Sequence, residues 1–515
     1  MRIKKDSVLY SSALLAVSSV ILQLLGFIYR IILGRAAGPQ VIAVHGLVMS
    51  AYNVVLSCTL TGIAFSVSRI AAKYQALGSG RSIPRLISAS LGLFLLLFSL
   101  LALPFGFFRD FFAQTILGNG ETAQALLLLV PCLFLTGFEN VHKAYFYGTQ
   151  FTLPPMVSET LEMCLRIGCA LLLFHLFGVP SPGGAAALIV LGMVLSEVVS
   201  ASFLTIVYRI HRRRLTGQDA VPLKQVLGDI AGMALPVSLS TLISRVLSSA
   251  NTVLIPRTLM LSGATQQAAM ETFGTLSGMT LPMLLLPSAF LSPLITVLTP
   301  KFSAAAALRN SREIKRKSAK ALHCVGLIGF PALAVILCFG RFLAQLLYKN
   351  ENAANFLFPL ALITLLGFYY VVCESILEGI GLQKRCSVLA VSATFFGVCV
   401  TWVVGGILRL GILGYLTGEL VSSIAGLAIS LFWVKKETGL QFRWQNWVGI
   451  PLLASALCIF TVRPVFLFFT GSGVSPLLCF AFCVSLFALL YSLCLRLLGV
   501  NYPAYLSSLR DNSVG

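Results

Sequence analysis

The sequence predicts an all-α integral membrane protein with about fourteen transmembrane helices. Three observations support this fold class. The 515 residues are 57% hydrophobic and only 10% charged, with a mean hydropathy of +0.92, which leaves too little polar surface to cover a water-soluble domain. Apolar runs of bilayer-spanning length recur along the whole chain. Basic residues gather in the short segments between alternate runs.

The apolar runs give the elements in order, at about 20 residues per span. The first run follows Arg2, Lys4 and Lys5 and is longer than the core of a signal peptide, so we expect it to be retained as a span. A first set of spans is predicted at residues 8–33, 42–66, 86–107, 123–145, 156–178 and 185–208. A second set is predicted at residues 229–255, 272–298, 321–340, 354–376, 386–407, 414–434, 447–469 and 476–499.

The distribution of charge sets the predicted orientation. With the N-terminus in the cytoplasm, most of the 37 lysines and arginines fall in cytoplasmic segments, and the even number of spans places the C-terminus there too. The densest basic runs, at 209–214 and 309–320, are then topology anchors at the anionic inner leaflet. The formal charge of +20 therefore does not indicate nucleic-acid binding.

An internal repeat predicts two pseudo-symmetric six-helix lobes. Residues 80–91 align without gaps on residues 311–322, and each segment follows the second span of its set. We predict an N-lobe at 1–208, a basic cytoplasmic linker at 209–228, a C-lobe at 229–440, and two additional C-terminal helices with a tail at 441–515. Substrate sites in such repeat folds lie between the halves near the middle of the membrane.

Catalytic and cofactor motifs are missing from the sequence. It contains no HExxH, GxSxG or GxxxxGK[ST] pattern, so an enzyme, a metal site and a nucleotide cofactor are not predicted. The 13 cysteines include no CxxC pair and fall mostly in apolar runs, which is typical of small core residues.

Arginines inside predicted spans mark the candidate substrate site. A charge in a membrane span is costly and usually faces a bundle interior, a partner or a wet cavity. Arg166 has Glu162 one helical turn earlier, so we expect a local ion pair. Arg30 and Arg245 have no such acid, and each lies on the first helix of its half.

Two interpretations of Arg30 and Arg245 remain open from the residues alone. One is an anionic ligand in a cavity, with Arg245 near the middle of its span as the stronger site and Arg30 nearer the outer end. Arg35 lies at the outer end of the same helix as Arg30. The other is a set of interhelical salt bridges to Glu139, Glu197 or Glu419.

Glu374 and Glu378 are one helical turn apart, where like charges repel. Three explanations are open: one carboxyl is protonated, a cation bridges the pair, or Lys384 and Arg385 compensate the charge at a solvated helix end. The first two correspond to a coupling site for H⁺ or Na⁺.

Several motifs resemble one bacterial family. LGFIYRIILGRAAG, TGIAFSVSRIAAKY and FGTLSGMTLPMLLLPSAF, with the segment at 234–263, are similar to the stage V sporulation protein B family. That family belongs to the polysaccharide transporter branch of the multidrug, oligosaccharidyl-lipid and polysaccharide (MOP) exporter superfamily. Arg30 matches a family arginine, Gln23 stands where some members have arginine, and Asn251 stands where many have aspartate. The similarity covers residues 8–440.

The resemblance implies a two-lobed flippase of the bacterial plasma membrane. Its substrate would be an undecaprenyl-pyrophosphate-linked oligosaccharide or peptidoglycan precursor, moved by alternating access, with membrane lipids as partners and H⁺ or Na⁺ for coupling. The residues that we predict to bind this substrate are Gln23, Arg30, Arg35, Arg245 and Asn251. The two C-terminal helices are expected to line a groove for the prenyl tail.

Three other functions remain open at this point. A cation-coupled multidrug or metabolite exporter of the same superfamily would place acids rather than arginines in the cavity. A membrane glycosyltransferase would need a large external loop with carboxylates, and the predicted external loops are short. A non-transporting scaffold for cell-wall enzymes is also compatible with the sequence.

Overall fold

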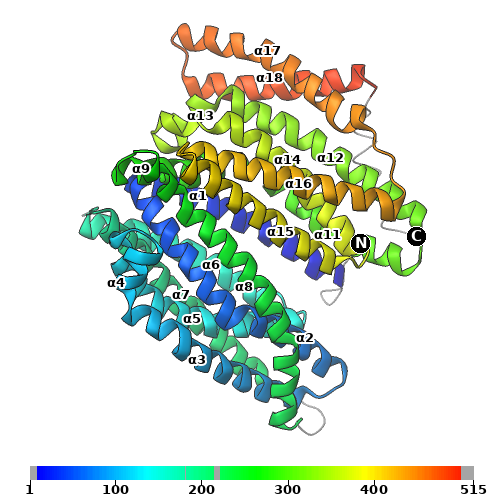
Figure 1. Ribbon diagram of the computed structural model, residues 1–515. Coiled ribbons are helices and arrows are strands. Elements are labelled where there is room, and N and C mark those ends of the chain that lie inside the picture. The colour runs from blue at the N-terminus through cyan, green and yellow to red at the C-terminus, as the bar shows by residue number, and fades with distance from the viewer. Residues whose placement is uncertain (1–7, 180, 214–220, 500–515) are drawn as a thin grey trace. The chain divides into compact units, whose positions relative to one another are not determined.

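The structure is a computed structural model that describes residues 8–179, 181–213 and 221–499 (Figure 1). Every regular element in these ranges is helical, as predicted. The predicted cytoplasmic ends of the chain, residues 1–7 and 500–515, and residues 214–220 of the predicted linker lie outside the described residues.

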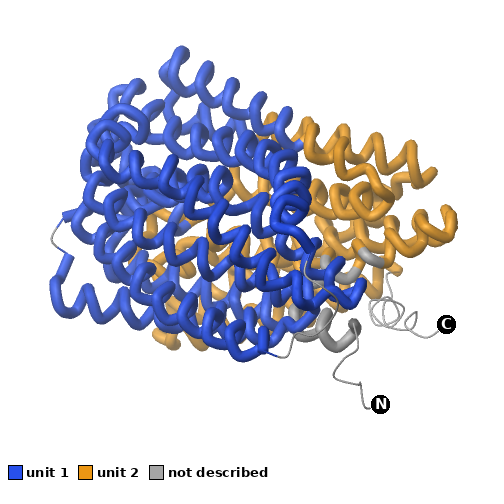
Figure 2. Tube along the Cα trace, turned by 90° about the horizontal axis from the view of Figure 1, so that it is seen from below, with its two compact units in different colours: residues 1–279, 390–419 blue, residues 280–389, 420–515 orange. Residues whose placement is uncertain are grey.

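The helices group into two compact units (Figure 2). Unit 1 comprises residues 1–279 and 390–419, and unit 2 comprises residues 280–389 and 420–515. The boundaries between the units fall inside α15 (Gln383–Val400) and α16 (Ile412–Thr438). The division into lobes at 208, 228 and 440 stays a prediction.

Unit 1 contains the first nine helices and the residues around the end of α15. Its helices are α1 (Val8–Leu56), α2 (Gly62–Ala76), α3 (Ile83–Phe107), α4 (Arg109–Phe111), α5 (Ala123–Gly148), α6 (Leu153–Phe177), α7 (Pro182–Arg212), α8 (Leu223–Leu261) and α9 (Gln266–Thr275). Helices α5, α6 and α7 pack against one another, and α1 contacts α6, α7, α8 and α9. The long α1 therefore connects the α5–α7 bundle with α8 and α9.

Unit 2 contains the remaining helices. They are α10 (Leu281–Leu285), α11 (Ser288–Ala307), α12 (Ser311–Cys338), α13 (Gly340–Tyr348), α14 (Leu357–Gly379), α17 (Ile450–Gly471) and α18 (Pro476–Leu497), with the π-helical turn η8 (Gln445–Gly449) before α17. A core that includes Leu327, Phe339, Cys458 and Phe487 joins α12, α17 and α18. The two C-terminal helices are therefore packed onto unit 2 by apolar burial.

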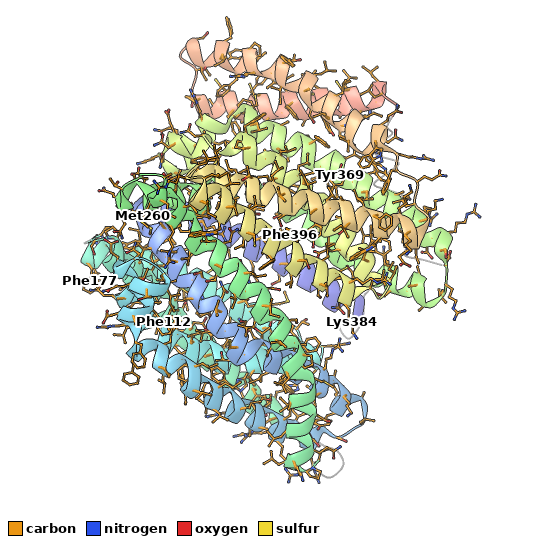
Figure 3. The ribbon with its side chains drawn as sticks, in the orientation of Figure 1. Phe112, Phe177, Met260, Tyr369, Lys384 and Phe396 are labelled. Atoms are coloured by element: carbon orange, nitrogen blue, oxygen red, sulfur yellow. The ribbon has the colours of Figure 1, made fainter. Side chains whose placement is uncertain are left out.

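Twelve of the described helical stretches are long and apolar enough to cross a membrane. The prediction of fourteen differs at two places. The first two predicted spans fall in one stretch, Val17–Ala76. The predicted span at 272–298 is broken into α9, the turn η5 (Leu276–Thr280), α10 and α11, where Pro282 and Pro287 interrupt regular helix. Large apolar side chains such as Phe177 and Phe396, 65% and 63% exposed, suit a lipid-facing surface (Figure 3).

Helix α1 consists of two helices that meet at Gly38. Gly38 has φ 80° and ψ 175°, and Pro39 begins the second half. This backbone conformation is open almost only to glycine. Gly38 therefore lies between the predicted spans at 8–33 and 42–66.

We expect Gly38→Ala to lower the free energy of unfolding by about 1–3 kcal/mol through backbone strain alone. No atom lies within 4 Å of the Cβ that alanine would add, so a steric clash is not part of the effect. The matched control is Gly92→Ala in α3, where the backbone is helical and the space is also open. Thermal unfolding in detergent measures both variants, and equal melting temperatures would contradict a strained Gly38.

Candidate functional site

A small polar pocket lies between the second half of α1 and the middle of α8, inside unit 1. It has a volume of about 120 Å³. Its lining residues, called the polar pocket below, are Gly46, Met49, Ser50, Asn53, Arg245, Ser248, Ser249 and Thr252. Five of the eight are neutral polar residues and one is a cation, although both helices lie in candidate membrane spans.

The polar pocket presents unmatched positive charge. The Arg245 side chain is exposed, and no described carboxylate lies within ion-pair distance of it. Several of the polar neighbours already donate to their own helices: Ser50 to the Leu47 carbonyl at 2.7 Å and Thr252 to the Ser248 carbonyl at 3.0 Å. The guanidinium therefore keeps donors for an anion, and phosphate oxygens match its planar fork.

Arg30, Arg35 and Gln23 lie on the first half of α1 and are not among the residues that line the polar pocket. Arg30 and Arg35 are exposed, and Gln23 is half-buried. The acids offered as alternative partners for the two arginines contact other residues: Glu139 contacts Lys143, Glu197 contacts Arg166, and Glu419 contacts Asn251. Within the described residues, Arg30 and Arg245 are thus not paired with these acids.

Asn251 lies on α8 between the lining residues Ser249 and Thr252, and its side chain contacts α16. Its amide nitrogen donates to Glu419 Oε1 at 2.8 Å, and its buried amide oxygen has no hydrogen-bond partner among the described residues. An aspartate at this position would set two carboxylates against each other. The asparagine is therefore matched to Glu419.

At pH values where both carboxyls are ionised, Asn251→Asp is expected to lower the free energy of unfolding by about 1–3 kcal/mol. The reason is that a buried hydrogen bond to Glu419 becomes a repulsive contact between two carboxylates. The loss should shrink as pH falls, since protonation of either carboxyl restores a donor. Melting temperatures at pH 5 and pH 8 measure the effect, and Asn251→Asp combined with Glu419→Gln should restore stability at pH 8. A pH-independent melting temperature of the single variant would contradict this account.

A second polar centre is buried in the α5–α7 bundle. The buried charge cluster consists of Glu139 and Lys143 from α5, Glu159, Glu162 and Arg166 from α6, and Glu197 from α7. Lys143 Nζ lies 2.9 Å from Glu139, 3.7 Å from Glu159 and 3.6 Å from Glu162. The predicted Arg166–Glu162 ion pair is confirmed, and Arg166 also lies 3.6 Å from Glu197.

The buried charge cluster has an excess of acid. Four carboxyls face two cations, so two negative charges lack a basic partner unless protons or a cation neutralise them. Carboxylate oxygens of Glu139, Glu162 and Glu197 lie within 4.8 Å of one another. Glu197 Oε2 is buried with no hydrogen-bond partner among the described residues. This geometry suits a proton or a small cation.

The sequence predicted the Arg166–Glu162 pair of this cluster but not the contacts of Lys143 with three glutamates. The spacing of Glu139 and Lys143, four residues apart, was the available signal. Ser200 from α7 also donates to Glu139, and Ser158 from α6 lies 2.6 Å from Ser200. Such contacts between helices have no signature in a single sequence.

Glu374 and Glu378 lie on α14 in unit 2. Tyr370 donates to Glu374 Oε1 at 2.7 Å, and Glu378 is exposed. Arg385 pairs with Glu437 at 3.2 Å. A coupling role for the two glutamates stays a prediction.

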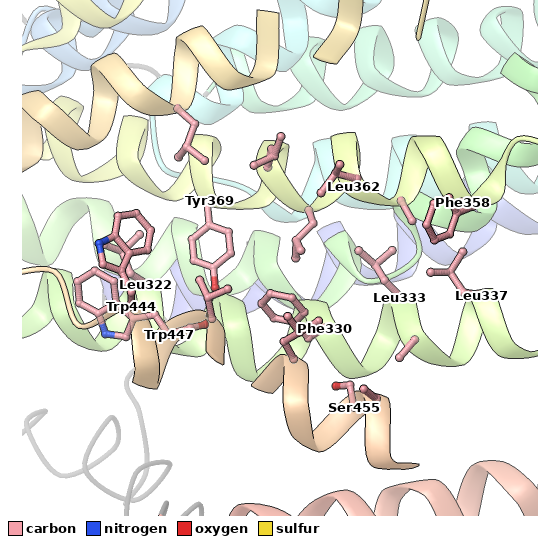
Figure 4. Close-up of a pocket in the computed structure, with 18 of the residues that line it drawn as sticks. Leu322, Phe330, Leu333, Leu337, Phe358, Leu362, Tyr369, Trp444, Trp447 and Ser455 are labelled. Atoms are coloured by element: carbon pink, nitrogen blue, oxygen red, sulfur yellow. Dashed lines mark hydrogen bonds between the residues drawn. The ribbon is translucent and has the colours of Figure 1, made fainter. Parts of the chain in front are cut away.

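A large apolar cavity lies in unit 2, with a volume of about 610 Å³ (Figure 4). Leucines and phenylalanines of α12 and α14 face it, and α16, η8 and α17 complete its lining. Trp444 and Trp447 stand at one end of the residues drawn, near Leu322, and Phe358 stands at the other (Figure 4). A hydrocarbon chain is the natural occupant of such a lining.

The fold and these polar centres define a multi-pass membrane protein with the architecture of MOP superfamily transporters. The structure matches one titled "Lipid II flippase MurJ, inward closed conformation" with a TM-score of 0.70 at 12% identity, over 94% of this chain and 98% of the other. It also matches an inward-facing multidrug resistance MATE family transporter with a TM-score of 0.68 at 18% identity, over 81% and 94%.

The chain belongs to the polysaccharide biosynthesis protein family, whose model matches residues 8–306. The family is part of the MOP superfamily, which consists of transporters and not enzymes. Among curated proteins, the chain is 24% identical to stage V sporulation protein B of Bacillus subtilis (strain 168) over 387 residues, which are 73% of this chain and 74% of that protein.

Proposed function

We propose that this protein is a flippase for a lipid-linked anionic saccharide of the undecaprenyl-pyrophosphate type, such as an oligosaccharide or peptidoglycan precursor. It works in the bacterial plasma membrane by alternating access between two pseudo-symmetric six-helix lobes, with both termini in the cytoplasm. The proposal rests on one observation: the polar pocket contains the cation Arg245, which has no described carboxylate partner. A pyrophosphate supplies the missing acceptors, and family membership supports a saccharide cargo.

The apolar cavity of unit 2 supports a lipid-linked substrate. A prenyl tail needs a hydrocarbon environment while its head group crosses the membrane, and the leucines, phenylalanines and tryptophans of this cavity provide one. Helix α17 contributes Leu452, Ala456 and Ile459 to the lining. This lining supports a tail site for α17, whereas no residue of α18 is among those that line the cavity.

Ala456→Trp is expected to slow transport of a prenyl-linked substrate by about tenfold or more, since the indole fills cavity volume that the tail needs. The control is Leu457→Trp on the same helix, because Leu457 is 50% exposed and does not line the cavity. Transport of labelled substrate in liposomes compares the two variants. Equal rates would exclude the cavity as the tail site.

The buried charge cluster supports coupling to H⁺ or Na⁺. Its two excess negative charges lie inside the membrane-spanning bundle, and binding or release of a cation there changes the charge that the membrane potential acts on. One charge moved through 100 mV provides about 2.3 kcal/mol. The predicted pair Glu374 and Glu378 is a second proposed coupling site.

Ligand-dependent stabilisation tests the substrate class directly. Undecaprenyl pyrophosphate should raise the melting temperature of the purified protein, because a ligand that binds only the native state stabilises it. Organic cations at equal concentration should not. The opposite order would favour the cation-coupled multidrug exporter, whose fold this chain shares. Stabilisation by neither class would favour a non-transporting scaffold.

A further inference from the structure

We infer that unit 2 carries a second anion site, a capture pocket for the pyrophosphate of the lipid-linked substrate at the cytoplasmic end of α12. The inference rests on the proposed function. It adds a site that is separate from the polar pocket at Arg245. It also assigns the order of events, with capture at the cytoplasmic surface before transfer to the polar pocket.

The basic pocket is formed by Arg312, Lys315, Arg316 and Lys320 of α12 together with Arg443, and it has a volume of about 700 Å³. The four α12 residues recur at spacings of three, four and eight from the first, so they share one face of the helix. Arg443 approaches from the segment that precedes α17. Five cations therefore converge on one cavity.

No acid among the described residues lines the basic pocket. Glu313, the acid in the same turn of α12, is held 2.6 Å from Lys317, which does not line the pocket. Asn310 caps the start of the helix: its side-chain oxygen accepts from the Glu313 backbone N–H at 3.1 Å, and its side-chain amide donates to Glu313 Oε2 at 3.2 Å. The three arginines and Lys315 of the basic pocket have no described carboxylate within ion-pair distance, and a ligand with two or more negative charges relieves the repulsion among them.

Trp447 joins the basic pocket to the apolar cavity, because it lines both. Its position is fixed from two sides. Tyr369 donates to the Trp447 carbonyl at 2.7 Å, and this carbonyl would lie only 2.0 Å from a Cβ added at Gly326. The close approach of η8 to α12 therefore depends on glycine at 326 and sets the two cavities side by side.

The aromatic residues at this junction mark the level of the membrane surface. Phe442 lies 5.3 Å from Trp444 and 5.9 Å from Trp447 between ring centroids. Tryptophans gather where an apolar and a wet environment meet. A ligand fits both cavities at once if it has a polyanionic head group, a hydrocarbon chain next to it, and a junction between the two at the level of these aromatic residues. A prenyl pyrophosphate has these three properties.

The capture pocket is tested by binding of undecaprenyl pyrophosphate to the full-length protein. Arg316→Gln combined with Arg443→Gln should weaken binding by roughly 10- to 30-fold, since each basic residue near a membrane surface contributes roughly a factor of three to five. The affinity of the wild type should also fall with added salt, and that of the double variant should fall less. Lys436→Gln, a basic exposed residue of α16 outside the pocket, should bind as the wild type does.

Three further ligands distinguish the source of the anion. Undecaprenol, inorganic pyrophosphate and phosphatidylglycerol should each bind more weakly than undecaprenyl pyrophosphate and compete poorly with it. Equal competition by phosphatidylglycerol would overturn the inference in favour of an anionic phospholipid site. Equal binding by inorganic pyrophosphate would remove the role of the apolar cavity.

The capture pocket and the proposed function fail in different ways. Arg245→Ala should keep binding at the capture pocket and lose transport. Unchanged binding by the Arg316 and Arg443 double variant would overturn the capture pocket and leave the assignment of Arg245 standing. If the double variant unfolds, the same comparison with Arg312→Gln and Lys315→Gln, both exposed, decides the question.

Discussion

Arg245→Ala should reduce transport of undecaprenyl-pyrophosphate-linked substrate by at least about tenfold, because a charge-assisted hydrogen bond contributes about 1.5–3 kcal/mol. Arg245 is the cation of the polar pocket, and Asn53, Ser248 and Ser249 offer no replacement charge. Initial rates in liposomes with a fluorescent substrate measure the effect.

Stability should change little in this variant, because the Arg245 side chain is exposed and has no described ion-pair partner to leave behind. The control for charge alone is Lys224→Gln, an exposed residue at the start of α8. Arg245→Lys should recover only part of the rate, because an ammonium cannot bind a phosphate with two parallel hydrogen bonds. Full activity of Arg245→Ala would remove the polar pocket from the substrate path.

Lys143→Met should be the most destabilising of the proposed substitutions, by about 3–5 kcal/mol, because it leaves buried carboxylates without a central cation. Lys143 is within 4.0 Å of Glu139, Glu159 and Glu162, and its side chain is 11% exposed. Thermal unfolding in detergent at pH 8 should show the loss, with less of it at pH 5, where carboxyls gain protons.

A double variant separates the charge effect from the loss of packing. Glu139→Gln added to Lys143→Met removes the carboxylate that lies 2.9 Å from the lysine, so the double variant should melt above the single variant. If the losses in stability of the two single variants simply add in the double variant, the lysine stabilises the protein by packing and not by its charge.

The fold class followed from composition, and the separation of the first two spans followed from their apolar runs, because both signals can be read from the residue types alone. The predicted span at 272–298 was wrong for a physical reason. A hydropathy pattern does not show that Pro282 and Pro287 break this apolar run into short helices. Where such a helix breaks depends on the backbone conformation at and before each proline, which the residue types allow but do not fix.

The candidate site was predicted best where a single helix decides whether a charge has a partner. Arg166 and Glu162 were paired from spacing alone, and Arg245 was singled out because no acid lies one helical turn away from it on α8. The partners that come from other helices were beyond such reasoning: Glu419 for Asn251, and Ser200 for Glu139. A single sequence shows which residues share one face of a helix. It does not show which residues of two different helices lie next to each other.

The most direct test of the central claim is transport by the wild-type protein. Liposomes with purified protein, a labelled undecaprenyl-pyrophosphate-linked saccharide in one leaflet and an imposed H⁺ or Na⁺ gradient should show protein-dependent appearance of the label in the other leaflet. Arg30→Ala and Arg245→Ala should both be slower, with the larger loss at Arg245. Failure of the wild type to move the label under either gradient, in protein that transports organic cations, would contradict the account.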